Sequence, residues 1–180
     1  MNFEGNALAA RQDCCNLCNM TIHEFDTLSP EELQKTLMEC CASRSWINKM
    51  MALVPFEDFI ELIESAEEQW FRCSREDWKE GISGNEEIAA IVSRQEEENG
   101  LASNQMTDET FERLESDSRK YEEKFGYRFV VYSIGKSPSE IISILNKRMN
   151  NDPVKEINIS AEEQNKIMKK KLRDLFFVEG

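Results

Sequence analysis

The sequence predicts an all-α protein, a compact single-domain helical bundle, and three observations lead to this prediction. A serine followed three residues later by a glutamate marks helix starts at Ser29, Ser137 and Ser160, because the two side chains cap each other's backbone amides. Apolar residues recur at helical spacing in several segments. Only residues 129–134 resemble a strand, and a single strand cannot form a sheet.

The composition is that of a folded domain with an acidic surface. The chain has 180 residues, of which 40% are hydrophobic and 32% charged, with a formal net charge of −13. This charge argues against nucleic-acid and anionic membrane partners, since both require a basic patch. No apolar run approaches the roughly 18 residues of a membrane span, and no secretory signal is visible. We therefore expect a cytoplasmic protein and leave a peroxisomal location open.

The beginning of the chain differs from the rest. Residues 1–19 show no clear hydrophobic period, whereas the pattern is much more regular from Met20 onward. This change predicts a poorly ordered N-terminal extension followed by one helical domain over residues 20–180.

Cysteines could suggest zinc or redox chemistry. The six cysteines are Cys14, Cys15, Cys18, Cys40, Cys41 and Cys73. Cys15 and Cys18 form a C-x-x-C pair, which can bind zinc or act in redox reactions. A second ligand pair at good spacing is absent unless Cys40, Cys41 or His23 completes the set. Without a secretion signal we interpret the cysteines as reduced thiols and expect no metal.

The first half of the domain contains two predicted helices. One begins at Ser29 with Pro30 in its first turn and continues to about Cys40. A short apolar segment containing Trp46 follows, up to Pro55. The next helix is predicted over about residues 55–72, with glutamates mostly opposite its apolar face. This acidic run is typical of a solvated helix face rather than of a metal site.

The second half is less regular at its start. Residues 74–105 have only a weak helical period, broken by glycines, and end in a polar linker over residues 100–105. A helix is predicted over about residues 108–124, and Gly126 suits the left-handed position just past its end. A last helix is expected to open at Ser160, with Pro153 separating it from the helix that Ser137 begins.

Residues 129–133 form a short extended run between two helix ends. Backbone amides in such a buried run must find hydrogen-bond partners, so the run could form a ligand-binding wall. Side-chain or water partners would satisfy these amides equally well. The following Gly135-Lys136-Ser137 resembles the end of a phosphate-binding loop, but the pattern requires glycine where this chain has Val130.

Two other motifs give little support for catalysis. His23 is the only histidine and lies before the first strong helix, which disfavours hydrolase sites that pair a histidine with a nucleophile. Ser93 and Glu96 have the spacing of a helix cap, and this pattern alone would not identify a site.

From about Met20 to its end, the chain resembles the decarboxylases of 2-oxo-4-hydroxy-4-carboxy-5-ureidoimidazoline (OHCU). The strongest match is Y-x-x-K-F-G-Y-x-F-V, from Tyr121 to Val130. Weaker matches cover residues 28–32, 135–141, 148–156 and 163–175. The family comprises all-helical, cofactor-free enzymes of purine metabolism that complete the conversion of urate to S-allantoin. The resemblance thus implies a small ureidoimidazoline substrate and no cofactor, and a homodimer is left open.

The resemblance also implies the site residues. The family's histidine motif, H-P-x-[IL]-G, is placed on residues 85–89, which puts Asn85 at the histidine position. Its S-x-x-E-Q motif is placed on residues 93–97, with Glu97 in place of glutamine. Asn85 and Glu96 would then be the catalytic pair. The implied substrate-binding residues are Glu86, Ser93, Arg94, Gln95, Glu97, Phe129, Val130, Val131, Tyr132, Ser133 and Arg148. Among these, Arg148 would meet a carboxylate.

These departures from the family bear on activity. Loss of carbon dioxide leaves a carbanion-like centre that must be protonated, and asparagine cannot titrate near neutral pH. Glu97 removes a donor and adds a negative charge near an anionic substrate. We interpret the chain as an OHCU decarboxylase-like protein of the ureide pathway with impaired activity. The alternative is a non-catalytic helical binding protein that kept the fold, so whether the chain is an enzyme stays open.

Overall fold

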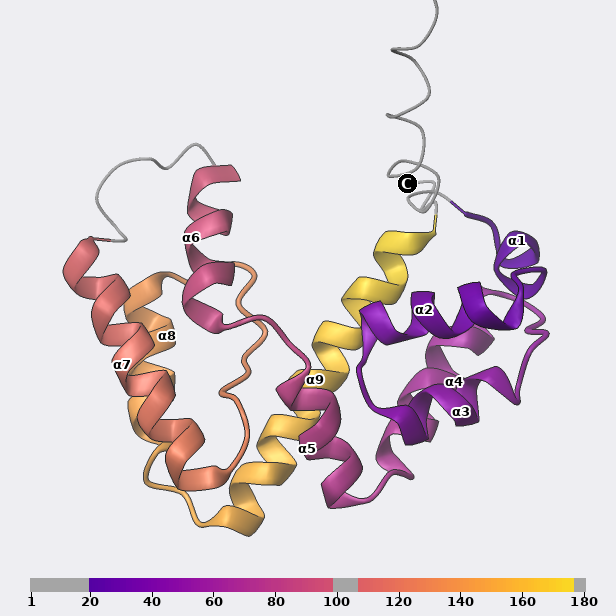
Figure 1. Cartoon of the computed structure of the whole chain (residues 1–180). Coiled ribbons are helices and arrows are strands. Elements are labelled where there is room, and N and C mark those ends of the chain that lie inside the picture. Colours follow the sequence, from indigo (N-terminus) through magenta and orange to yellow (C-terminus); the bar gives the residue numbers. More distant parts are fainter. Residues whose placement is uncertain (1–19, 99–106, 177–180) are drawn as a thin grey trace, which may run out of the picture.

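The computed structural model describes residues 20–98 and 107–176, with residues 95–98 described by their backbone alone. The described ranges contain nine α-helices and no sheet, which confirms the predicted all-α class (Figure 1). The helices are α1 Ile22–Asp26, α2 Pro30–Cys40, α3 Arg44–Met51, α4 Phe59–Phe71, α5 Arg75–Ser83, α6 Ile88–Glu98, α7 Asp108–Phe125, α8 Pro138–Arg148 and α9 Pro153–Leu175. None of these helices is long and apolar enough to span a membrane. The predicted extension over residues 1–19 and the predicted linker lie outside the described residues.

Local capping chemistry sets several helix ends as predicted. Ser29 and Ser137 each accept a hydrogen bond from the amide three residues later, and Glu32 and Glu140 reciprocate. Helix α7 ends at Gly126, which adopts a left-handed φ of 79°. These ends follow from residues only a few positions apart, which is why the sequence predicts them.

The predicted helix start at Ser160 is wrong. Helix α9 already begins at Pro153, because Asp152 accepts hydrogen bonds from the amides of Val154 and Lys155. Proline also suits the first helical position, so Pro153 opens the helix instead of merely separating two helices. Ser160 lies fully buried inside α9, where its hydroxyl accepts a hydrogen bond from Arg148 at 2.8 Å.

Three other boundaries differ from the sequence prediction. Helix α4 starts at Phe59 and not near residue 55, because Asp58 caps it by accepting from the amide of Glu61. The irregular stretch after residue 74 contains two helices, α5 and α6. A Ser74–Asp77 capping box opens α5, with aspartate in the place of the more usual glutamate. Ser93 lies within α6 and therefore does not cap a helix.

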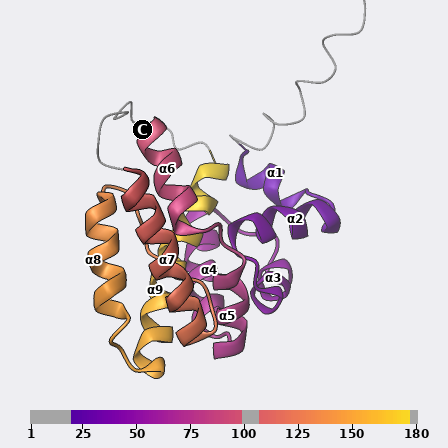
Figure 2. The same ribbon diagram turned by 60° about the vertical axis from the view of Figure 1, so that its left-hand side comes forward.

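Helix α9 runs through the middle of the molecule and joins two hydrophobic cores. Figures 1 and 2 show α1–α4 on one side of α9 and α6–α8 on the other. The first core surrounds Trp46 and Trp70, both fully buried, and includes Ala161, Met168 and Leu172 of α9. The indole of Trp70 donates to the carbonyl of Ala161 at 2.9 Å, which fixes α4 against α9. The second core lies among α6, α7, α8 and residues 127–131.

The end of α5 packs closely against the α2–α3 connection. A Cβ atom added to Gly84 would lie 2.2 Å from the Cβ of Ala42, a contact that only a shift of backbone could relieve. The absence of a side chain at Gly84 therefore allows α5 to end beside α3, and it sets the position of the next residue, Asn85.

We expect Gly84→Ala to lower the free energy of unfolding by about 1–3 kcal/mol, because overpacking forces neighbouring atoms apart. Urea denaturation of the parent and the variant measures this change. Ser83→Ala, at an exposed position one residue earlier, is the matched control and should unfold at nearly the parent midpoint. Equal midpoints for both variants would show that this helix approach is not tight.

Candidate functional site

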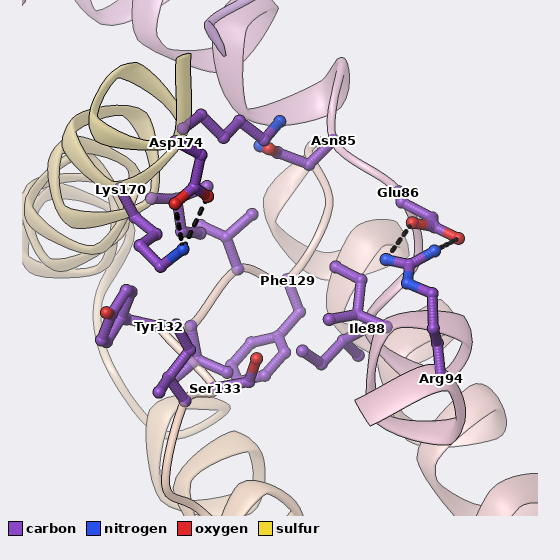
Figure 3. Close-up of a pocket in the computed structure, with 15 residues that line it drawn as sticks. Asn85, Glu86, Ile88, Arg94, Phe129, Tyr132, Ser133, Lys170 and Asp174 are labelled. Carbon is purple, nitrogen blue, oxygen red and sulfur yellow. Dashed lines mark hydrogen bonds and ion pairs between the residues drawn. The ribbon is translucent and has the colours of Figure 1, made fainter. Parts of the chain in front are cut away.

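A pocket of about 270 Å³ lies between the α5–α6 connection, residues 129–134 and the C-terminal half of α9 (Figure 3). The structure brings together Asn85, Glu86, Arg94 and the whole run 129–133 along its walls. These segments are far apart in the sequence. Ile88, Ile91 and Ile167 contribute an apolar side, so the pocket has both polar and apolar walls.

The other sequence-predicted site residues are placed differently. Ser93 lies in α6 beside Arg94 but is not among the residues that line the pocket. Gln95, Glu96 and Glu97 belong to α6, and their side chains lie outside the described part of the structure. Arg148 is 5% exposed, and the structure does not bring it to the pocket surface.

Asn85 is held firmly at the pocket wall. Its side-chain nitrogen donates to the carbonyl of Ile82 at 2.9 Å and to Oε1 of Gln164 at 2.6 Å. Its backbone carbonyl accepts a hydrogen bond from the guanidinium of Arg128. The side-chain oxygen of Asn85 has no hydrogen-bond partner among the described residues, and it is not fully buried. A ligand in the pocket would therefore meet a fixed hydrogen-bond acceptor.

The extended run carries unpaired backbone donors. The amide of Tyr132 donates to Oε2 of Glu163 at 2.7 Å. Within the described ranges, no partner accepts from the amides of Phe129, Val130, Val131 or Ser133. Since buried backbone amides are almost always paired, this wall is suited to a ligand with hydrogen-bond acceptors.

The pocket also contains one unpaired positive charge. Figure 3 shows two ion pairs at its walls, Lys170 with Asp174 and Arg94 with Glu86, the latter at 2.9 Å. Lys171 also lines the pocket, and the described residues offer it no ion-pair partner. The charges within each of these two ion pairs cancel, so the described pocket walls carry a net charge of +1 from Lys171. An anionic group would be favoured here despite the acidic character of the whole chain.

Sequence reasoning did not identify these lysines. A signal was available, because Lys170 and Lys171 lie three and four residues after Ile167, which was predicted to be buried. Residues at these spacings lie on one side of a helix, so all three reach the same region. The pattern does not show which cavity this face of the helix lines, because that depends on packing against segments far away in the sequence.

The cysteines within the described ranges are poorly suited to chemistry. Burial raises the pKa of Cys40 and of Cys41 to about 12, so both thiols stay protonated near neutral pH. Cys73 is also buried, and desolvation raises its pKa. In the part of the chain that the structure describes, no cluster of histidine, cysteine, aspartate or glutamate could hold a metal ion. The C-x-x-C pair lies outside that part.

Comparisons with known proteins agree on one family. The OHCU decarboxylase family model matches residues 26–173. A curated relative, the uric acid degradation bifunctional protein TTL of Arabidopsis thaliana, is 27% identical over 147 residues. These cover 76% of this chain and 45% of the relative, so this chain spans less than half of that protein's length.

Two solved structures share the fold. One is an OHCU decarboxylase in the presence of (S)-allantoin, with a TM-score of 0.68 and 27% identity. The match covers 77% of this chain and 95% of that chain. The other is an (S)-allantoin synthase, with a TM-score of 0.66, 15% identity and coverage of 87% and 54%, a likeness of fold alone.

Proposed function

Because the chain belongs to the OHCU decarboxylase family, we propose that its pocket binds OHCU or a closely related ureide and that it decarboxylates this ligand only weakly. The observation that carries the proposal is the set of free polar groups in one cavity. Lys171 supplies a cation, Val131 and Ser133 supply backbone donors, and Asn85 supplies an acceptor.

These groups complement the chemistry of OHCU. The ligand has a carboxylate, which suits an unpaired lysine, and ring and ureido carbonyls, which suit free backbone amides. Its ureido N–H groups can donate to the side-chain oxygen of Asn85. The apolar wall formed by Ile88, Ile91 and Ile167 excludes water from the ring faces and strengthens the polar contacts.

Weak catalysis follows from the side chain at position 85. When the carboxylate leaves as carbon dioxide, its bonding electrons remain on the ring carbon, which must then accept a proton on one face. The family places a histidine here, whereas Asn85 can orient a substrate but cannot transfer a proton near neutral pH. Glu97, at the family's glutamine position, adds repulsion toward an anionic substrate. Glu96 is the proposed remaining acid–base group.

The proposal is tested by following chiral allantoin formation from freshly generated OHCU with and without the protein. We expect a small acceleration or none over the spontaneous reaction, with any excess product in the S form. A rate typical of a fully active decarboxylase would overturn the weak-activity part of the proposal.

A non-catalytic binding protein is the second candidate function. The observation that favours it is that Asn85 is held at the pocket wall, where its side-chain oxygen can accept a hydrogen bond but its amide cannot titrate near neutral pH. This candidate predicts saturable binding of (S)-allantoin together with no acceleration of OHCU decarboxylation. Binding accompanied by measurable turnover would favour the enzyme instead.

Lys171 should dominate recognition of the negative charge. We expect Lys171→Met to weaken binding of orotate, a cyclic ureide with a carboxylate, by about 10-fold or more, as loss of a charge-assisted hydrogen bond implies. Lys170→Met combined with Asp174→Asn is the matched control, because it removes both charges of this ion pair and leaves the net charge of the pocket walls at +1. Uracil, which lacks the carboxylate, should bind both variants alike. Equal losses of orotate affinity in the Lys171→Met variant and in the control, measured by calorimetry, would contradict the assignment of the anion-binding charge to Lys171.

A further inference from the structure

We propose that Arg148 is a positioning residue for the pocket. From behind the wall it holds the carbonyl of Val130 and thereby directs the backbone N–H and carbonyl of Val131 into the cavity. The identity of the ligand rests on the proposed function, whereas the orientation of the wall rests on the contacts of Arg148 alone.

The guanidinium of Arg148 is fixed on every side. It lies at the end of α8 and donates from Nη1 to the carbonyl of Val130 at 2.7 Å. Its Nε donates to Oε1 of Glu156 at 2.7 Å, and its Nη2 donates to Ser160 at 2.8 Å. The guanidinium carbon also lies 4.8 Å from the ring centre of Phe129. With all three guanidinium nitrogens donating to protein groups and 5% of its surface exposed, Arg148 is not placed to bind a ligand directly.

Glu156 connects this arginine to two further segments. It is fully buried, and it accepts hydrogen bonds from Tyr121 at 2.5 Å and from Asn151 at 2.6 Å. The network therefore joins α7, α8 and α9 to the pocket wall. Buried ion pairs are often no more stabilising than apolar residues of similar volume, but they hold their partners in one arrangement. The member of this network that reaches the wall is the Val130 carbonyl.

The geometry of an extended chain transmits this contact to the pocket. The peptide between Val130 and Val131 is trans, so the carbonyl of Val130 and the N–H of Val131 point in opposite directions. Along extended backbone, the carbonyl of Val130 and the N–H of Tyr132 share one side. Arg148 holds the first group and Glu163 holds the second.

The N–H and carbonyl of Val131 are consequently left on the other side of the run. Val131 lines the pocket, and neither of these backbone groups has a partner in the described ranges. An adjacent donor and acceptor match the N–H and C=O of an amide or ureide edge. Arg148 thus sets the direction of a recognition element that it does not touch.

Two variants test this positioning without leaving an unpaired buried charge. The first variant, Arg148→Met with Glu156→Gln, removes both charges. The second, Arg148→Lys, keeps a positive charge beside Glu156 but lacks the planar guanidinium that also donates to the carbonyl of Val130. Tyr121→Phe is the matched control, because it removes the hydrogen bonds of the Tyr121 hydroxyl to Glu156, Ser160 and Nη2 of Arg148 but leaves the contact between Arg148 and Val130 intact.

The measurements are the backbone NMR signals of Val130 and Val131 without ligand, and the Kd of (S)-allantoin. In both Arg148 variants we expect the carbonyl signal of Val130 and the amide signal of Val131 to move and the Kd to rise about 10-fold, as loss of one well-aimed hydrogen bond implies. Tyr121→Phe should retain the parent signals and Kd.

Three outcomes would overturn the inference. One is a folded Arg148 variant with the parent Kd, and another is a Tyr121→Phe protein that loses as much affinity as the Arg148 variants. If the parent binds no (S)-allantoin, the proposed function fails instead. The orientation of the Val131 backbone is then judged from the NMR signals recorded without ligand. An unchanged amide signal of Val131 in the Arg148 variants is the third outcome, and it would overturn the positioning role of Arg148.

Discussion

Asn85→His should accelerate S-allantoin formation above the parent rate, and adding Glu97→Gln should accelerate it further. A missing general acid or base lowers a rate by about 10²–10⁴-fold, which bounds what histidine can restore. An imidazole at position 85 can donate to Gln164 or to the carbonyl of Ile82, which now accept from the Asn85 amide. The single variant should recover only part of the rate, because the proposed repulsion between Glu97 and an anionic substrate would remain.

Initial rates and product chirality for the parent, the single variant and the double variant measure this recovery. Asn85→Gln is the matched control, since it keeps an amide and cannot titrate, and it should show no gain. A parent rate equal to that of the double variant would mean that Glu96 or another group handles the proton without histidine. No gain in either variant would indicate a pocket that does not bind OHCU productively and would favour the binding-protein alternative.

Glu156→Ala should lower the free energy of unfolding by about 3–5 kcal/mol, because it leaves the guanidinium of Arg148 buried without its counter-charge. Arg148 and Glu156 are 5% and 0% exposed, and their charged atoms lie 2.7 Å apart. Removing both charges, as in Arg148→Met with Glu156→Gln, should recover a large part of this loss. The pair therefore fixes geometry more than it adds stability.

Urea denaturation provides the comparison. Lys120→Gln serves as the control because it breaks an exposed ion pair with Asp117, and such pairs contribute about 0–1 kcal/mol. A loss of stability clearly below about 3 kcal/mol for Glu156→Ala would show that solvent reaches the guanidinium of Arg148. A double variant no more stable than Glu156→Ala would show that the hydrogen bonds, and not the charge balance, hold these helices together.

The helix ends show where sequence reasoning succeeds. Ser29, Ser137 and Gly126 act on backbone groups within four residues, so their effects can be predicted from sequence alone. Ser160 has the same capping pattern as Ser29 but lies inside a helix, because Asp152 caps α9 eight residues earlier. Its hydroxyl instead accepts a hydrogen bond from Arg148. A capping pattern therefore predicts a start only where no earlier cap exists.

The pocket shows where local reasoning ends. The grouping of Asn85 with residues 129–133 came from a family resemblance, since no spacing rule joins segments more than 40 residues apart. Lys171 was missed because its place on the pocket wall depends on how α9 crosses the domain. Arg148 was expected to meet a substrate carboxylate, and the structure instead surrounds it with protein partners from α7, α9 and the pocket wall.

The most direct test of the central claim is an NMR titration of the parent protein with (S)-allantoin, observing backbone amides. The proposed pocket predicts saturable shifts at Val131 and Ser133, with smaller changes around Asn85 and Lys171. The helices α2–α4, on the far side of α9, should remain unchanged. No saturable shift at Val131, or shifts confined to residues outside the pocket, would contradict the claim that this cavity binds a ureide.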